Sequence, residues 1–124
     1  MKVAVSSTGP DLQAAVDPRF GRCTFFLIVE TDDLSFEAIE NSNASAGGGA
    51  GIQSALLVSK KEAKVVLTGN CGPNAEKTLK AGGIDVVLNC SGVITDVLKD
   101  FKSGKFKIAE GPNVESHAGM NSGS

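Results

Sequence analysis

Hydrophobic and polar positions change their period along this chain, and the changes mark two kinds of element. Short runs rich in valine, isoleucine and phenylalanine predict β-strands. Longer stretches in which apolar residues recur every three or four positions predict helices. The predicted strands cover residues 2–6, 24–30, 36–41, 65–68 and 84–88. The predicted helices cover residues 52–61, 73–81 and 93–101.

The order of these elements predicts an α/β fold, because three strands come first and helices then alternate with strands. Asp32-Asp33 forms the turn that joins the second and third strands into a hairpin. The later strands follow helical crossovers, which are right-handed and give parallel neighbours. We therefore expect one five-stranded mixed sheet, with strand order 3-2-1-4-5 and helices on its faces. Residues 1–108 would form this single domain, and residues 109–124, which show no periodicity, a flexible tail.

The directions of the strands bring four loops to one edge of this sheet. The first, third, fourth and fifth strands end there, and the second strand begins there. The loops cover residues 7–23, 43–51, 69–73 and 89–92. They contain the three cysteines of the chain, Cys23, Cys71 and Cys90. Ligands of open α/β folds generally bind at this carboxyl edge, so we expect the binding site there.

Glycines and arginines on these loops favour an anion as the ligand. Three helices begin at this edge behind glycines, and each presents unpaired N–H groups and the positive end of its dipole. Glycine lets a ligand approach the backbone closely, and arginine adds charged donors. The residues predicted to bind the anion are Arg19, Arg22, Gly47, Gly48, Gly49, Gly51 and Gly72. The alternative is that the glycines only form tight turns between strands and helices.

The cysteines and the histidine give a weaker signal for a metal site. Cys71 is the best candidate for a soft metal ligand, because it precedes a helix N-terminus, where the pKa of a thiol is lowered. A buried structural role for Cys71 is the alternative. Cys23 and Cys90 each adjoin an apolar strand and are expected to pack there. His117, the only histidine, lies in the predicted tail, where we expect it to be solvated.

Composition and missing motifs exclude several classes of function. With 124 residues and a net charge of −2, the chain offers no basic face for nucleic acid. It contains no apolar run of membrane-spanning length and no signal-peptide pattern at its N-terminus. Its odd number of cysteines favours a reducing cytoplasm over a secreted disulfide framework. The glycine-rich loop lacks the residues of a P-loop, and no general acid or base is visible at the edge, so we expect a non-catalytic binding protein.

Three short motifs carry a resemblance to a known family. They are FGR at residues 20–22, GGAGI at 48–52 and GPNA at 72–75. Over residues 1–108 the chain resembles the dinitrogenase iron–molybdenum cofactor biosynthesis family, and most of all its small stand-alone members from anaerobic bacteria and archaea. The resemblance implies a ribonuclease H-like fold. It also implies binding, storage or carriage of an anionic metal–sulfur cluster that contains molybdenum, either a molybdenum–copper sulfide or an iron–molybdenum precursor, and contact with other cofactor-biosynthesis proteins.

The chain departs from the family at two positions that bear on the site. Many members carry a histidine shortly before the glycine-rich loop, whereas this chain has Asn43-Ala44-Ser45-Ala46 there. The resemblance then implies that a cluster is held by thiolate, backbone N–H groups and arginine, or without direct side-chain ligands. Cys71 stands where apolar residues are common in the family. The alternative function is a regulatory module that binds a partner ATPase in an anaerobe, without a cluster and independently of Arg19 and Cys71.

Overall fold

The computed structural model describes residues 1–42 and 49–106 of the chain, which form five strands and three helices. The strands are β1 (Lys2–Ser7), β2 (Phe25–Glu30), β3 (Phe36–Glu40), β4 (Val65–Leu67) and β5 (Asp85–Val87). The helices are α1 (Ala50–Lys60), α2 (Pro73–Ala81) and α3 (Ile94–Lys102). The predicted elements are therefore all present, in the predicted order.

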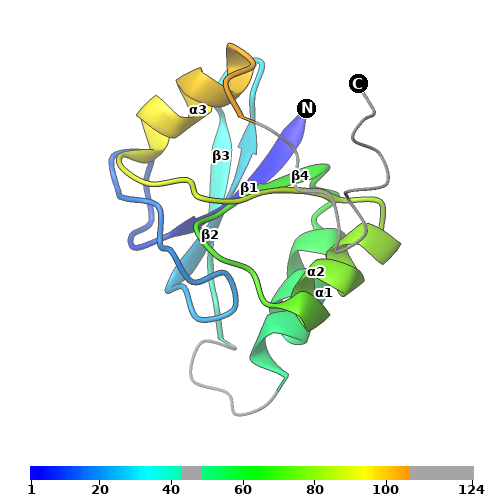
Figure 1. The fold of residues 1–124 in the computed structure, drawn as a ribbon. Coiled ribbons are helices and arrows are strands. Elements are labelled where there is room, and N and C mark those ends of the chain that lie inside the picture. The colour runs from blue at the N-terminus through cyan, green and yellow to red at the C-terminus, as the bar shows by residue number, and fades with distance from the viewer. Residues whose placement is uncertain (43–48, 107–124) are drawn as a thin grey trace.

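The sheet has the strand order β3-β2-β1-β4-β5, which confirms the predicted mixed topology. β2 runs antiparallel to both of its neighbours, while β1, β4 and β5 are mutually parallel. Val3 of the central strand pairs with Val29 on one side and with Val65 on the other. α3 lies on one face of the sheet, and α1 and α2 lie together on the opposite face (Figure 1).

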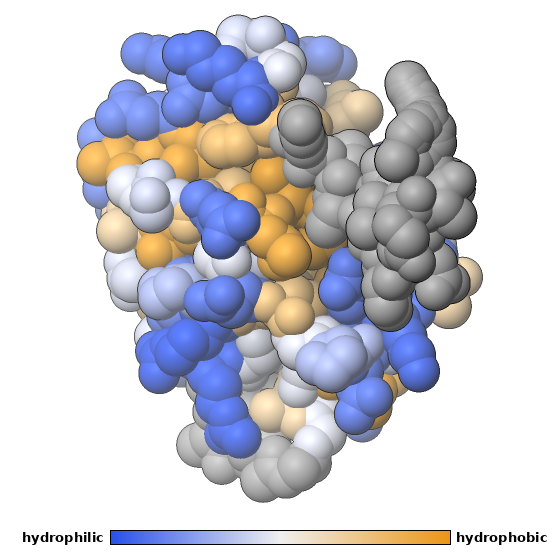
Figure 2. Space-filling model, viewed as in Figure 1, coloured by the Kyte–Doolittle hydropathy of each residue, from blue (hydrophilic) through white to orange (hydrophobic). Residues whose placement is uncertain are grey.

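Alternate residues of β1 face two separate hydrophobic cores. Val3 and Val5 contact the core under α3, and Ala4 contacts the core under α1 and α2. A strand that is buried on both faces needs a continuous apolar run, which is the pattern that predicted it. On the α3 side, apolar side chains gather at the surface below the helix (Figure 2). Phe101 and Phe106 pack against the core under α3 and are only partly buried.

The observed elements differ from the predicted ones mainly at their ends. α1 begins at Ala50, two residues before the predicted start at Ile52. Gly49 precedes the helix in a left-handed conformation, with φ of 93°, and glycine and alanine carry no hydrophobic period that could mark this turn. β4 and β5 are three residues long, shorter than the apolar runs that predicted them.

Some predictions concern segments that lie outside the described residues. They include the domain boundary at residue 108, the flexible tail over 109–124, the solvated His117, and the positions of Gly47 and Gly48. Within residues 1–42 and 49–106, no helix has the length and apolar character needed to cross a bilayer.

Candidate functional site

At the carboxyl edge of the sheet, the loop that follows β1 lies directly on the loop that follows β4. The amide of Asn70 donates to the carbonyl of Pro18 at 2.7 Å, and the amide of Phe20 donates to the carbonyl of Asn70 at 3.1 Å. A Cβ atom at Gly69 would lie 2.7 Å from the Cα of Pro18. Real Cβ atoms do not approach backbone so closely, so only glycine allows these two loops to join.

Two more glycines bring the starts of α1 and α2 together. A Cβ atom at Gly21 would lie 2.9 Å from the Cα of Gly51, in the first turn of α1. A Cβ atom at Gly51 would in turn lie 3.2 Å from the Cβ of Ala75, in the first turn of α2. The first turn of α1 is thus held between the loop after β1 and the first turn of α2. The N-termini of both helices therefore lie side by side at the carboxyl edge.

A hollow of about 230 Å³ opens between these two N-termini. Its lining consists of Gly21, Gly49, Gly51, Ile52, Gly72, Pro73, Asn74 and Ala75. A Cβ atom at Gly49 or at Gly72 would meet no heavy atom of the described chain within 4 Å, so both glycines face open space. Half of the lining residues are glycine, and a ligand can therefore reach the backbone itself.

The amides at this hollow have the chemistry of an anion site. Gly49 and Gly72 are the N-cap residues of α1 and α2, and in the described chain neither helix has a side-chain cap hydrogen bond. Among residues 1–42 and 49–106, no acceptor is found for the first-turn N–H groups of Ala50, Gly51, Ile52, Asn74 and Ala75, as is typical of a helix N-terminus. Because the positive ends of two helix dipoles meet here, the hollow favours a negatively charged ligand. We call it the amide hollow.

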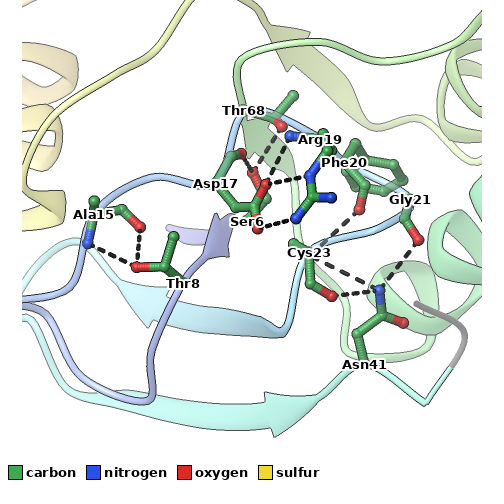
Figure 3. Close-up of polar contacts among 10 residues, drawn as sticks. All are labelled: Ser6, Thr8, Ala15, Asp17, Arg19, Phe20, Gly21, Cys23, Asn41 and Thr68. Atoms are coloured by element: carbon green, nitrogen blue, oxygen red, sulfur yellow. Dashed lines mark hydrogen bonds and ion pairs between the residues drawn. The ribbon is translucent and has the colours of Figure 1, made fainter. Parts of the chain in front are cut away.

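Arg19 lies at the same edge but outside the amide hollow. Its Nε atom is 3.2 Å from Oδ1 of Asp17, and its Nη2 atom is 3.3 Å from Oδ2 (Figure 3). The Arg19 side chain is 64% exposed, whereas that of Asp17 is 3% exposed. Hydrogen bonding and the charge of Asp17 raise the pKa of Arg19, so the guanidinium stays charged. Arg22 is exposed and directly follows Gly21, which lines the hollow.

The three cysteines do not converge on a common site. Cys23 is buried in the core under α1 and α2, and Cys90 is buried in the core under α3, on the other face of the sheet. Desolvation raises the pKa of Cys23 to about 12 and that of Cys90 to about 11. Among the residues that the structure describes, no three His, Cys, Asp or Glu side chains form a group that could hold a metal ion. Both cysteines therefore pack, as predicted.

Cys71 is partly buried against the core under α1 and α2. Burial, together with the negative charge of Glu76 in the first turn of α2, raises the pKa of its thiol to about 11. The predicted lowering of this pKa by the helix N-terminus is therefore wrong. The residue lies two positions before the helix begins, and desolvation together with Glu76 outweighs the helix dipole. At neutral pH Cys71 is a thiol rather than a thiolate.

Two buried polar residues, Asn41 and Ser54, hold the loop at Gly21, and no sequence pattern points to them. The Nδ2 atom of Asn41 donates to the carbonyl of Gly21 at 3.3 Å and to that of Cys23 at 3.0 Å (Figure 3). The hydroxyl of Ser54, in α1, donates to Oδ1 of Asn41 at 3.4 Å. Asn41 follows β3 and is far along the chain from the loop at Gly21 and from Ser54. No local pattern could therefore identify these contacts.

Asp17 is a second functional candidate that local patterns do not reveal, because aspartate before proline is typical of a turn. Its Oδ1 accepts the amide of Arg19 at 3.0 Å, the contact that such a turn makes. The same carboxylate also binds the guanidinium of Arg19. The spacing of Asp and Arg by two residues around Pro18 was the available signal, but it does not reveal that Asp17 is buried.

A comparison with protein families matches residues 1–104 to the dinitrogenase iron-molybdenum cofactor family. Among curated proteins, an uncharacterised protein of Methanocaldococcus jannaschii is 34% identical over 98 residues, which is 77% of this chain and 83% of that protein.

Solved structures share both the sequence pattern and the fold. The apo form of the orange protein from Desulfovibrio gigas is 37% identical, with a TM-score of 0.86 over 90% of this chain and 95% of that one. A NifB-like protein from Thermotoga is 32% identical, with a TM-score of 0.75 over 86% of this chain and 91% of that one.

Proposed function

Because this chain belongs to the dinitrogenase iron-molybdenum cofactor family, we propose that it binds and carries an anionic metal–sulfur cluster at the amide hollow. The cluster is cargo, and the protein acts on it by binding rather than by catalysis. The observation that supports this most directly is the meeting of two helix N-termini at a hollow lined by glycine, where no side chain of the described residues caps either helix. The relation to an orange protein whose structure is of an apo form agrees with a ligand-binding role.

The size of the hollow favours a compact ligand. Sites for drug-sized molecules usually measure roughly 300–1,000 Å³, and the amide hollow measures about 230 Å³. A nucleotide would therefore extend well beyond it. A metal sulfide anion is compact and has acceptor atoms on all sides, so it can accept hydrogen bonds from the amides of α1 and α2 at the same time.

Each predicted site residue has a distinct part in this proposal. The N–H groups of Ala50, Gly51 and Ile52 in α1, and those of Asn74 and Ala75 in α2, bind the sulfides. Gly47 and Gly48 lie outside the described residues, and their proposed part is to supply further backbone N–H groups. Arg19 and Arg22 supply positive charge at the edge. Cys71 serves as a metal ligand only for a soft ion such as Cu(I), which can displace the proton of a thiol.

Two compact cargoes fit this chemistry, a molybdenum–copper sulfide and an iron–molybdenum precursor. Anaerobic titration of the apo-protein with tetrathiomolybdate, with and without Cu(I), tests for the first. We expect a charge-transfer band that saturates at a fixed ratio of metal to protein, and co-elution of molybdenum with the protein on gel filtration.

The outcome that contradicts the proposal is equally definite. If no band appears, and neither molybdenum nor iron stays with the protein after gel filtration, the protein does not carry such a cluster. Binding of a partner protein that is unaffected by Arg19→Ala and by Cys71→Ser would then favour the regulatory alternative.

A further inference from the structure

The most unusual charged group at the carboxyl edge is Asp17. It is 2% exposed, although carboxylates are rarely buried without a strong reason. Within the described part of the chain, its carboxylate accepts hydrogen bonds from Arg19, through the backbone amide, Nε and Nη2. A negative charge at the edge of an anion site opposes binding, so its presence there calls for a function that outweighs this repulsion.

Asp17 is fixed to the sheet through its backbone. Its amide donates to the carbonyl of Ser6 at 2.8 Å, and its carbonyl accepts the hydroxyl of Ser6 at 2.7 Å. The Ser6 hydroxyl also lies 2.7 Å from that of Thr68, which follows β4. Ser6 and Thr68 are fully buried, and Asp17 therefore lies at the ends of β1 and β4, the two central parallel strands (Figure 3).

Arg19 is held at both of its ends. Its backbone forms a bridge with Asn70, two residues before the N-cap of α2, and its guanidinium is bound on one edge by Asp17. The contacts with Asp17 use Nε and Nη2, which leaves the N–H groups of Nη1 for other acceptors. A guanidinium that is held in this way loses little side-chain entropy when it meets an anion.

We propose that Asp17 is a positioning residue for the anion site, which holds Arg19 as a pre-oriented donor beside the amide hollow. This inference rests on the proposed binding of an anion there. The carboxylate fixes one edge of the guanidinium so that the other edge meets the ligand. Asp17 thereby strengthens anion binding in spite of its own negative charge.

The test measures the affinity for tetrathiomolybdate alone, by anaerobic optical titration of the full chain. Asp17→Asn keeps the side-chain oxygen that accepts the Arg19 amide but removes the charge that holds the guanidinium. We expect the affinity to fall by about 10-fold, the lower end of the loss that is typical when an outer partner of a metal ligand is removed. A carboxylate that acted only as a nearby negative charge would give the opposite sign, because its removal would strengthen binding.

A second variant separates orientation from charge and does not depend on Asp17. Arg19→Lys keeps the positive charge, but an ammonium cannot be held along one edge. Because the buried Asp17 carboxylate loses the Nε and Nη2 donors, the affinity is compared at a temperature where the variant is shown by circular dichroism to be folded. We expect the same loss of about 10-fold. In the double variant Asp17→Asn with Arg19→Lys, the two losses should not add, because they remove the same interaction.

The possible results distinguish the two proposals. If the wild-type protein does not bind tetrathiomolybdate at all, the proposed function fails. If the wild type binds, and Asp17→Asn binds equally well or more tightly in protein that unfolds at an unchanged temperature, the role of Asp17 is refuted. Additive losses in the double variant would also refute it.

Discussion

The hollow at the amino edge of the sheet is larger than the amide hollow at the carboxyl edge, about 510 Å³ against about 230 Å³. Its lining consists of Met1, Lys2, Ser59, Glu62, Ala63, Lys64, Gly82 and Ile84. Charges of both signs lie around it. The carboxyl-edge hollow has no charged lining residue within the described chain, and backbone amides dominate it.

The difference lies in the hydrogen bonds at the helix ends. At the amino edge, the last carbonyls of α1 and α2 are already bound within the chain. Ser59 accepts the amide of Glu62 at 2.9 Å, and Leu79 accepts those of Gly82 and Ile84 at 3.0 and 2.9 Å. At the carboxyl edge, no side chain of residues 1–42 or 49–106 caps the first amides of the same helices. Polar groups without a partner in that part of the chain, rather than volume, are therefore what favours the carboxyl edge in the proposed function.

The largest expected difference between the two edges is in the free energy of unfolding, and one added methyl group at each edge tests it. In Gly69→Ala the new Cβ would lie 2.7 Å from the backbone of Pro18. Backbone cannot move aside as a flexible side chain can, so we expect the free energy of unfolding to fall by about 3 kcal/mol, the upper part of the usual range for overpacking. Urea unfolding followed by circular dichroism measures it.

The matched control is Gly82→Ala at the amino edge, where the nearest heavy atom would be 3.5 Å away. This variant should stay within about 0.5 kcal/mol of the wild type. Equal losses in both variants would show that the close contact between the loops does not govern stability.

The next effect is on binding, and Gly72→Asp should produce it. The residue has φ of −66° and open space around its missing Cβ, and aspartate is a favoured N-cap. The new carboxylate would take the first amides of α2, so tetrathiomolybdate affinity should fall by about 30-fold, or about 2 kcal/mol, while stability is unchanged or slightly raised.

Gly82→Asp introduces the same charge at the amino edge and serves as the control for Gly72→Asp. Because exposed charges more than about 8 Å apart are largely screened at physiological salt, its affinity should stay within about twofold of the wild type. If both variants bind equally well, the amides of α2 do not hold the anion.

The third effect tests Cys71 through pH. Its pKa is about 11, above the ordinary value of 9.0, so the thiolate fraction rises about tenfold per pH unit between pH 7 and 9. If the thiolate coordinates Cu(I), the Cu(I) affinity of the tetrathiomolybdate-loaded protein should rise by up to about tenfold per pH unit, and Cys71→Ser should abolish the slope. Tetrathiomolybdate alone should bind equally at pH 7 and 9, since amides do not titrate there. If the Cu(I) affinity does not change with pH, Cys71 is not a metal ligand.

The smallest effect concerns backbone strain at the amino edge. Glu62, two residues after the end of α1, has φ of 65°, a left-handed conformation that favours glycine. Glu62→Gly should raise the free energy of unfolding by about 0.5 kcal/mol, since relief of strain slightly exceeds the entropy cost of glycine. Asn89→Gly, with φ of 64° at the carboxyl edge, should change it less because asparagine tolerates this conformation. Chemical unfolding of both variants compares them, and a larger gain at Asn89 would contradict this account.

Local patterns were sufficient for the fold but only partly so for the site. The apolar run of β1 and the helical period of α3 are local patterns that predict each element. Strand order and the shared loop edge could then be predicted from the order of the elements. The start of α1 could not, because Gly49, Ala50 and Gly51 carry no period. The predicted state of Cys71 was wrong, because its pKa depends on how much of the side chain the core covers.

The order of the elements is enough to predict that glycine-bearing loops and helix N-termini share the carboxyl edge, because strand direction follows from it. Which of these groups meet depends on the packing of the folded chain. This packing places Cys23 and Cys90 on opposite faces of the sheet, and it joins Asp17 to Arg19 above buried Ser6 and Thr68. Such contacts depend on distances between residues far apart in the chain and on desolvation, and neither quantity is encoded in a local pattern.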